Sequence, residues 1–176
     1  MKLIWPHLQA CAGPESEEMS KAARPYVHRF QVRFPEVDSY GVVWHGHYVA
    51  YLELARNALC AAAGLSPGDT LAAGYKAPIT RVELSLRRSA RLEDELEVHV
   101  IGRPPETARL VMDYEIRRAG VHGRAGLLGT GHTEQVVLDR NEELLLGLPA
   151  PVKELVARIQ AYHRGERELP AERIRA

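Results

Sequence analysis

Apolar and polar side chains alternate along residues 26–34. The larger side chains fall on every second position: Tyr26, His28, Phe30, Val32 and Phe34. A period of two residues is typical of a strand with one buried face and one exposed face. The pattern therefore predicts that the ordered domain begins with a strand near Tyr26.

Beyond Asp38 the period changes from two residues to steps of four and three. The apolar positions with this spacing are Tyr48, Leu52, Ala55, Leu59 and Ala62. They form one continuous stripe on a predicted helix, while Glu53, Arg56 and Asn57 lie off the stripe. Gly64 is well placed to end this helix, because glycine is favoured just after a helix C-terminus.

Four further strands are predicted, with no second long helix between them. They cover residues 79–88, 96–100, 109–117 and 127–138; the first three alternate, and the fourth ends in a dense apolar run. Proline and glycine at 104–105 and 119–123 indicate turns between strands. Glycines within 126–131 indicate bends or close backbone packing inside the last strand.

A final helix is predicted to open at Pro151. Its apolar face carries Val152, Leu155, Val156, Ile159 and Tyr162. The order is therefore strand, helix, four strands, helix. This order predicts an α+β architecture, with an antiparallel five-stranded sheet wrapped around a central helix and a C-terminal helix added to it.

The length and composition indicate a single globular domain, and the balanced charge indicates that its ligand is a small molecule. The 176 residues, 45% of them apolar, can bury one good core. There are 23 basic and 23 acidic residues, so no net basic charge points to nucleic acid or to a polybasic membrane anchor. The apolar residues of 1–24 show no regular spacing, so this segment is expected to form a flexible arm. A domain at 25–165 and a tail at 166–176 are expected to follow it.

The cysteines and histidines indicate neither a metal site nor a disulfide framework, and the lack of long apolar runs indicates the cellular location. Cys11 and Cys60 form neither a zinc-ligand cluster nor a disulfide framework, and Cys60 is expected to pack as a small buried side chain. His45 and His47 lack a third ligand of fitting spacing, so no metal is expected. Without a run of about 18 apolar residues or a secretory apolar segment, we expect a cytoplasmic protein with no stable membrane insertion.

The turn between the first strand and the helix carries the most informative motif. From Asp38 to Tyr48 it reads D-x-x-G-V-V-W-H-x-x-Y, and Leu-Glu-Leu-Ala-Arg follows at 52–56. This run resembles the signature of hotdog-fold acyl-CoA thioesterases of the 4-hydroxybenzoyl-CoA thioesterase type, including the branch associated with the Tol-Pal envelope system. The resemblance extends over residues 26–160 and is strongest over 38–56. It implies the hotdog fold, in which a sheet wraps around a central helix.

The resemblance also implies roles for the residues of this motif. Asp38 matches the catalytic carboxylate of the family, as general base for water or as direct nucleophile through a transient anhydride. His45 matches the start of the central helix, where its side chain or its backbone N–H would orient the thioester and stabilise the oxyanion. The implied substrate-binding residues are Gly41, Val42, Val43, Trp44 and Tyr48.

The same residue types also have plainer explanations. An aspartate before Ser-Tyr-Gly commonly forms a turn or caps a helix. His47 is expected to be solvated or capping, since the motif places the functional histidine at 45. Arg87, Arg88 and Arg91 could meet the phosphates of coenzyme A or could simply line a solvated strand end.

The function that the resemblance implies is hydrolysis of aryl or short to medium aliphatic acyl-CoA, without metal or other cofactor. The apolar and aromatic side chains around Trp44 favour an uncharged acyl group. The alternative is a non-catalytic hotdog protein that binds acyl-CoA or an acyl carrier. Because a single sheet leaves an edge strand open, a homodimer or homotetramer is expected.

Overall fold

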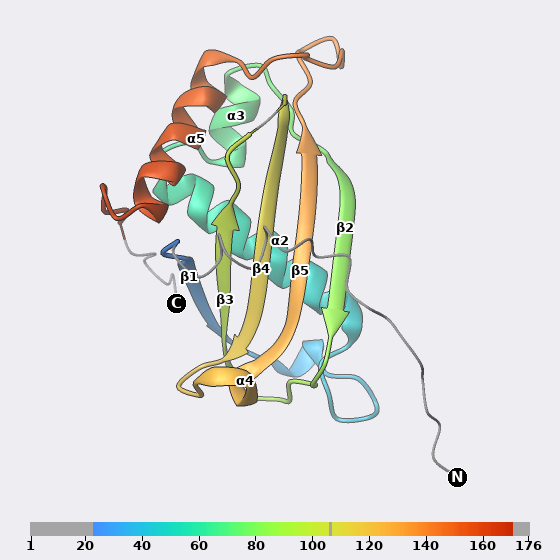
Figure 1. Cartoon of the computed structure of the whole chain (residues 1–176). Helices are drawn as coiled ribbons and strands as arrows, with labels where there is room; N and C mark the ends of the chain where they lie inside the picture. Colours follow the sequence, from blue (N-terminus) through green and yellow to red (C-terminus); the bar gives the residue numbers. More distant parts are fainter. Residues whose placement is uncertain (1–22, 106, 171–176) are drawn as a thin grey trace, which may run out of the picture.

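The computed structural model describes residues 23–105 and 107–170. Its elements, in chain order, are β1 Tyr26–Gln31, η1 Phe34–Glu36, α2 His45–Ala62, α3 Pro67–Ala72, β2 Ile79–Leu86, β3 Glu95–Gly102, β4 Arg109–Arg118, α4 Gly123–Gly126, β5 Leu127–Val136 and α5 Ala150–His163. The five strands form one sheet in the order β1-β3-β4-β5-β2, and every pairing is antiparallel. The predicted α+β architecture, with its central and C-terminal helices, is confirmed (Figure 1).

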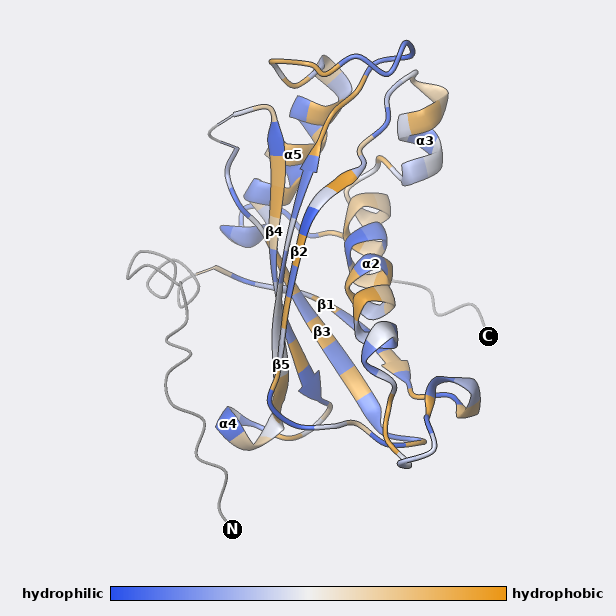
Figure 2. Ribbon diagram, turned by 90° about the vertical axis from the view of Figure 1, so that its right-hand side faces the viewer, coloured by the Kyte–Doolittle hydropathy of each residue, from blue (hydrophilic) through white to orange (hydrophobic). Residues whose placement is uncertain are grey.

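The sheet curves around α2, which lies across one of its faces (Figure 1). Buried positions alternate with partly exposed ones along β3 and β4, because only one side of each strand faces the core. Figure 2 shows this alternation as bands of apolar and polar residues along β3. From α2, Tyr48, Leu52 and Leu59 are each at most 1% exposed. Burying a leucine in this way contributes about 1.5–3 kcal/mol to the stability of the fold.

Two glycines of β5 let neighbouring elements approach this strand closely. A Cβ atom at Gly131 would lie 2.6 Å from Cδ1 of the buried Leu52, so a side chain there would force Leu52 to shift from its place against the sheet. At Gly129 a Cβ atom would lie 2.6 Å from the carbonyl oxygen of Ser85 in β2. The close packing expected from the glycines at 126–131 is confirmed, and it sets the depth at which α2 sits.

The structure corrects three expectations about the elements. β1 ends at Gln31, because the chain turns into η1 and leaves Phe34 79% exposed. Arg56, expected off the buried stripe, is 6% exposed, since the covered arc of α2 is wider than one stripe and also buries Tyr51 and Ala58. The helix α3 was not expected, because it is short and buries no residue that would give it a period.

Residues near both ends of the described chain contact the folded domain. The expected flexible arm falls largely outside the described residues, as does Cys11, but the Arg24 N–H donates to the His163 carbonyl at 2.9 Å. At the other end Leu169, assigned to the tail, packs against the core. Cys60 is partly buried, and burial raises the pKa of its thiol to about 11. Between residues 23 and 170, none of the described helices is long and apolar enough to cross a membrane.

His163, in the last turn of α5, joins the two ends of the domain to the sheet. Its side chain is 4% exposed; Nδ1 donates to the Arg24 carbonyl at 2.8 Å, and Nε2 accepts the Gly102 N–H at 3.0 Å. Both ring nitrogens are therefore occupied when the ring is neutral. Burial lowers the pKa of His163 below its ordinary value, although the Arg24 carbonyl favours the protonated ring.

This arrangement predicts a loss of stability on acidification. The unfolded chain takes up the His163 proton near pH 6.5, whereas the folded protein takes it up only at lower pH, so the free energy of unfolding falls as the pH drops below about 6.5. We expect His163→Gln to cost about 1–3 kcal/mol at pH 7.5. Measured by urea denaturation, the difference in the free energy of unfolding between His163→Gln and the wild type should be smaller at pH 5.5 than at pH 7.5. Exposed His122, replaced by Gln, is the control; a wild-type advantage that is independent of pH would refute the prediction.

Candidate active site

Asp38 lies in a tight turn between η1 and α2. The Asp38 N–H donates to the Val42 carbonyl at 2.9 Å, and the Gly41 N–H donates to the Asp38 carbonyl at 3.0 Å. Gly41 has a φ of 73°, a left-handed conformation that glycine adopts without steric cost. A bridge between Val37 and Val43 closes the turn. The chain therefore gives Asp38 a defined place directly before the central helix.

The Asp38 carboxylate is half-buried and is oriented by its own turn. Oδ1 accepts the Tyr40 N–H at 2.8 Å, the turn-forming bond that aspartate commonly makes. In the part of the chain that the structure describes, Oδ2 accepts no hydrogen bond. One carboxylate oxygen thus shapes the turn, and the other is open to a further donor.

The N-terminus of α2 follows this turn. The helix begins at His45, and the cap residue Trp44 makes no side-chain capping bond. N–H groups in a first helical turn have no partner within the helix and carry a partial positive charge. The first turn of α2 holds no acidic residue that would compensate this charge. This helix end can therefore polarise a carbonyl oxygen or bind an anion.

The Trp44 ring covers the first turn of α2. Its centroid lies 4.9 Å from that of His45 and 5.7 Å from that of His47. Gly46 makes room for the indole, because a Cβ atom there would fall 2.0 Å from Trp44 Cζ3. Trp44 is still 49% exposed, so an apolar surface stands beside the start of the helix.

The other predicted substrate-binding residues differ in exposure. Val42 is half-buried, whereas Val43 and Tyr48 are buried. The Tyr48 hydroxyl accepts the Ala90 N–H at 2.9 Å, and the Val43 N–H donates to the Ala90 carbonyl at 2.9 Å. These contacts place Val43 and Tyr48 beneath the turn, where they fasten it to the segment before β3. Their contact with substrate stays a prediction.

Glu36 is a buried carboxylate that the sequence motif did not single out. It lies two residues before Asp38 and accepts hydrogen bonds from the Tyr51 hydroxyl and from Arg33. Burial works to raise the pKa of Glu36, but these donors outweigh burial and hold the pKa below its ordinary value. The sequence offered only half of a capping-box signal, a glutamate three residues after Arg33, whose N–H donates to Glu36 Oε2 at 2.8 Å. Nothing in the sequence indicates the hydrogen bond between Glu36 and Tyr51.

Arginine side chains gather where β2 ends. Arg87, Arg88 and Arg124, together with Leu127, line a hollow of about 160 Å³. The Arg88 guanidinium donates to the carbonyl oxygens of Arg124 and Leu127. This hollow lies at the same end of the sheet as the light-blue turn that holds Asp38 (Figure 1). No carboxylate among the described residues pairs with these three arginines, so the site can take an anion.

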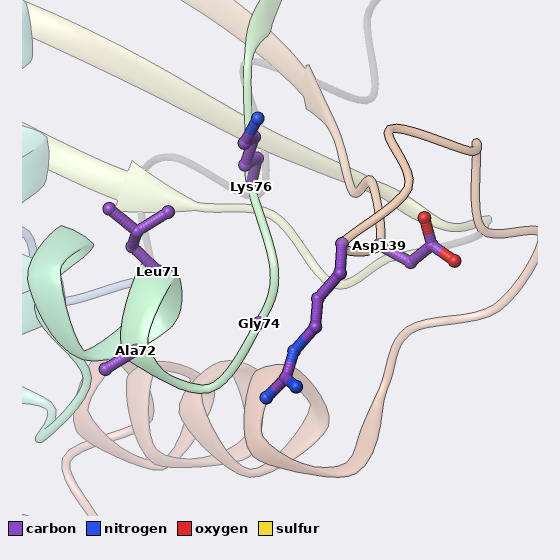
Figure 3. A pocket seen from close by; sticks show the side chains of 6 residues that line it. Leu71, Ala72, Gly74, Lys76 and Asp139 are labelled. Carbon is purple, nitrogen blue, oxygen red and sulfur yellow. The ribbon is translucent and has the colours of Figure 1, made fainter.

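A larger hollow, of about 290 Å³, lies at the opposite end of the sheet beside α3. Its lining comprises Leu71, Ala72, Gly74, Lys76, Asp139 and Arg140 (Figure 3). Lys76 already pairs with Glu142. No residue of the motif lines this hollow, so size alone does not locate the candidate site.

The chain is similar in sequence to a known protein family. The model described as the thioesterase-like superfamily matches residues 32–159. YneP of Bacillus subtilis (strain 168), named as a candidate acyl-CoA thioesterase, is 28% identical over 69 residues. That match covers 39% of this chain and 50% of YneP, so the chain spans about half the length of this relative.

Several solved structures share the architecture. Slr0204 of Synechocystis, a 1,4-dihydroxy-2-naphthoyl-CoA thioesterase, has a TM-score of 0.69 at 20% identity, covering 78% of this chain and 98% of its own. The DHNA-CoA thioesterase of Staphylococcus aureus has a TM-score of 0.68 at 22% identity, covering 81% and 95%. Protein TT1821 of Thermus thermophilus has a TM-score of 0.67 at 29% identity, covering 78% and 98%. The expected hotdog fold is confirmed by these likenesses.

The family match and the fold coincide over most of the chain. The matched residues run from the residue after β1 into α5 and include the whole motif from Asp38 to Arg56. Placement within the 4-hydroxybenzoyl-CoA thioesterase type, or its Tol-Pal-associated branch, stays a prediction. From the match over residues 32–159 we conclude that this protein belongs to the thioesterase-like superfamily.

Proposed function

We propose that this protein hydrolyses acyl-CoA thioesters at the corner between the Asp38 turn and the start of α2. One observation carries the proposal: a carboxylate with an open oxygen lies in a turn directly before an uncapped helix N-terminus. Membership of the thioesterase-like superfamily supports the same reaction. The alternative, a binding protein without hydrolytic activity, is an outcome of the test below.

The two parts of the site have complementary tasks. The N–H groups of His45 and Gly46, at the start of α2, bind the thioester carbonyl and stabilise the oxyanion of the tetrahedral intermediate. Asp38 takes a proton from the attacking water, or attacks the carbonyl carbon itself and forms an anhydride that water then cleaves. In both routes the C–S bond breaks, coenzyme A leaves as the thiolate and takes up a proton, and the acid is released.

The surroundings of the corner favour an uncharged acyl group and a phosphorylated carrier. Half-exposed Trp44 and Val42 offer an apolar surface that suits aryl or short to medium aliphatic chains. Two structural neighbours are named as thioesterases of 1,4-dihydroxy-2-naphthoyl-CoA and of DHNA-CoA; the first of these acyl groups is aromatic, which supports the aryl class. The arginines at 87, 88 and 124, which pair with no carboxylate among the described residues, suit the phosphates of coenzyme A.

The active form is a homodimer in this proposal. Among the described residues, the strand β2 pairs only with β5 and leaves its other edge open. On that edge strand Val82 and Leu86 are 41% and 39% exposed, an apolar surface that a second β2 can cover. Antiparallel pairing of two copies would extend the sheet and bring the partner towards the site.

Asp38→Asn tests the catalytic carboxylate. Asparagine can still accept the Tyr40 N–H and keep the turn, but it can neither accept a proton nor form an anhydride. We expect the rate of thiol release from a panel of aryl, short, medium and long acyl-CoA to fall about 10²–10⁴-fold. Asp139→Asn is the matched control, because Asp139 Oδ1 also accepts backbone N–H groups of its own turn. Full activity of Asp38→Asn would refute the mechanism, and binding without thiol release by the wild type would favour the binding protein.

Charge on the edge strand tests the dimer. Val82→Lys combined with Leu86→Lys places two ammonium groups beside the side chains of the partner strand, which carries the same two charges by symmetry. We expect a monomer by light scattering at micromolar concentration, where the wild type is a dimer or larger. Val121→Lys, in the turn before α4 and 38% exposed, is the control and should leave assembly unchanged. A monomeric wild type would contradict the proposal.

A further inference from the structure

We infer that Glu36 is a positioning residue, which fixes the place of Asp38 relative to the N-terminus of α2. This inference rests on the proposed function, because it gives Glu36 a role only through Asp38. The basis is geometric: one residue is bonded to the central helix through its side chain and to the residue before that helix through its backbone.

The side-chain tie reaches into the second turn of α2. The Tyr51 hydroxyl donates to Glu36 Oε2 at 2.8 Å. Tyr51 itself is 2% exposed and is held between two rings, with centroids 4.4 Å from Phe30 and 5.8 Å from Tyr48. The donor is therefore rigid, and Glu36 is joined to a fixed point of the helix.

The backbone tie lies at the start of the helix. The Trp44 N–H donates to the Glu36 carbonyl at 2.9 Å. With the bridge between Val37 and Val43, this bond closes the segment 37–43 into a short loop that contains Asp38. A shift of Asp38 relative to the start of α2 requires at least one of these ties to break.

The remaining acceptor positions of Glu36 hold the chain before it. The Arg33 backbone N–H donates to Oε2 at 2.8 Å, and the guanidinium donates to Oε1 at 2.9 and 2.7 Å. Because the Arg33 side chain is 75% exposed, this ion pair adds little stability for the cost of burying a carboxylate. What the carboxylate supplies is a set of acceptors for donors on both sides, which a glutamine cannot match without turning its own NH₂ towards one of them.

A double-mutant cycle separates positioning from a general effect on folding. Glu36→Gln should lower kcat about 10–100-fold with little change in KM, because small misplacement of a reacting group costs up to about 10²-fold in rate. In the Asp38→Asn background the same change should alter the residual rate by less than about twofold, since no carboxylate is left to position. Tyr51→Phe, which removes only the hydroxyl, should reproduce both results. Glu97→Gln is the control, because Glu97 is a partly buried, ion-paired carboxylate remote from the motif.

The outcomes distinguish this inference from the proposed function. The positioning role would be overturned if Glu36→Gln and Tyr51→Phe lowered kcat equally in the wild-type and Asp38→Asn backgrounds. It would also be overturned if neither variant lowered kcat in the wild-type background. Asp38 would stay essential in both cases. Full activity of Asp38→Asn alone would overturn the proposed mechanism and the positioning role with it. If Glu36→Gln fails to fold by circular dichroism, Tyr51→Phe decides, because its rigid ring keeps the packing with Phe30 and Tyr48.

Discussion

The burial of α2 against the curved sheet is the constraint on which the rest of the structure depends. Leu52 and Leu59 are fully enclosed, and the loss of either would cost about 2–5 kcal/mol through lost burial and the cavity left behind. Gly131 in β5 allows the close approach. Because the helix is held along its length, its N-terminus has one place in the molecule, and the turn before it must be built to meet that place.

That requirement explains the dense bonding of the Asp38 turn. Eight residues connect η1 to α2, and they are tied by a bridge between Val37 and Val43 and by the hydrogen bond from the Trp44 N–H to the Glu36 carbonyl. The Tyr48 hydroxyl and the Val43 N–H both bond to Ala90, so the turn is also fastened to the segment before β3. A short loop with this many ties loses little further entropy when a substrate binds, which favours a preorganised site.

The sequence predicted the parts of this arrangement that follow from period and motif. The steps from Tyr48 to Ala62 predicted the helix, the strand patterns predicted the sheet, and both are confirmed. The capping box of α3 from Ser66 to Asp69 was visible in the sequence, but six residues without a buried side chain give no period to support a helix. The role of Tyr51 was not predictable, because Glu36 and Tyr51 are 15 residues apart and meet only when η1 folds against α2.

Two carboxylates near each other in the chain can differ in chemistry because their hydrogen bonds differ. Glu36 is 4% exposed, and both its oxygens already accept bonds from Tyr51 and Arg33, so neither is free to take a proton from water. Asp38 is half-buried, and only Oδ1 is bonded to the described residues. A base or nucleophile needs an oxygen that a reactant can reach. The environment therefore divides the tasks: the fully bonded carboxylate can hold geometry, and the partly bonded one can react.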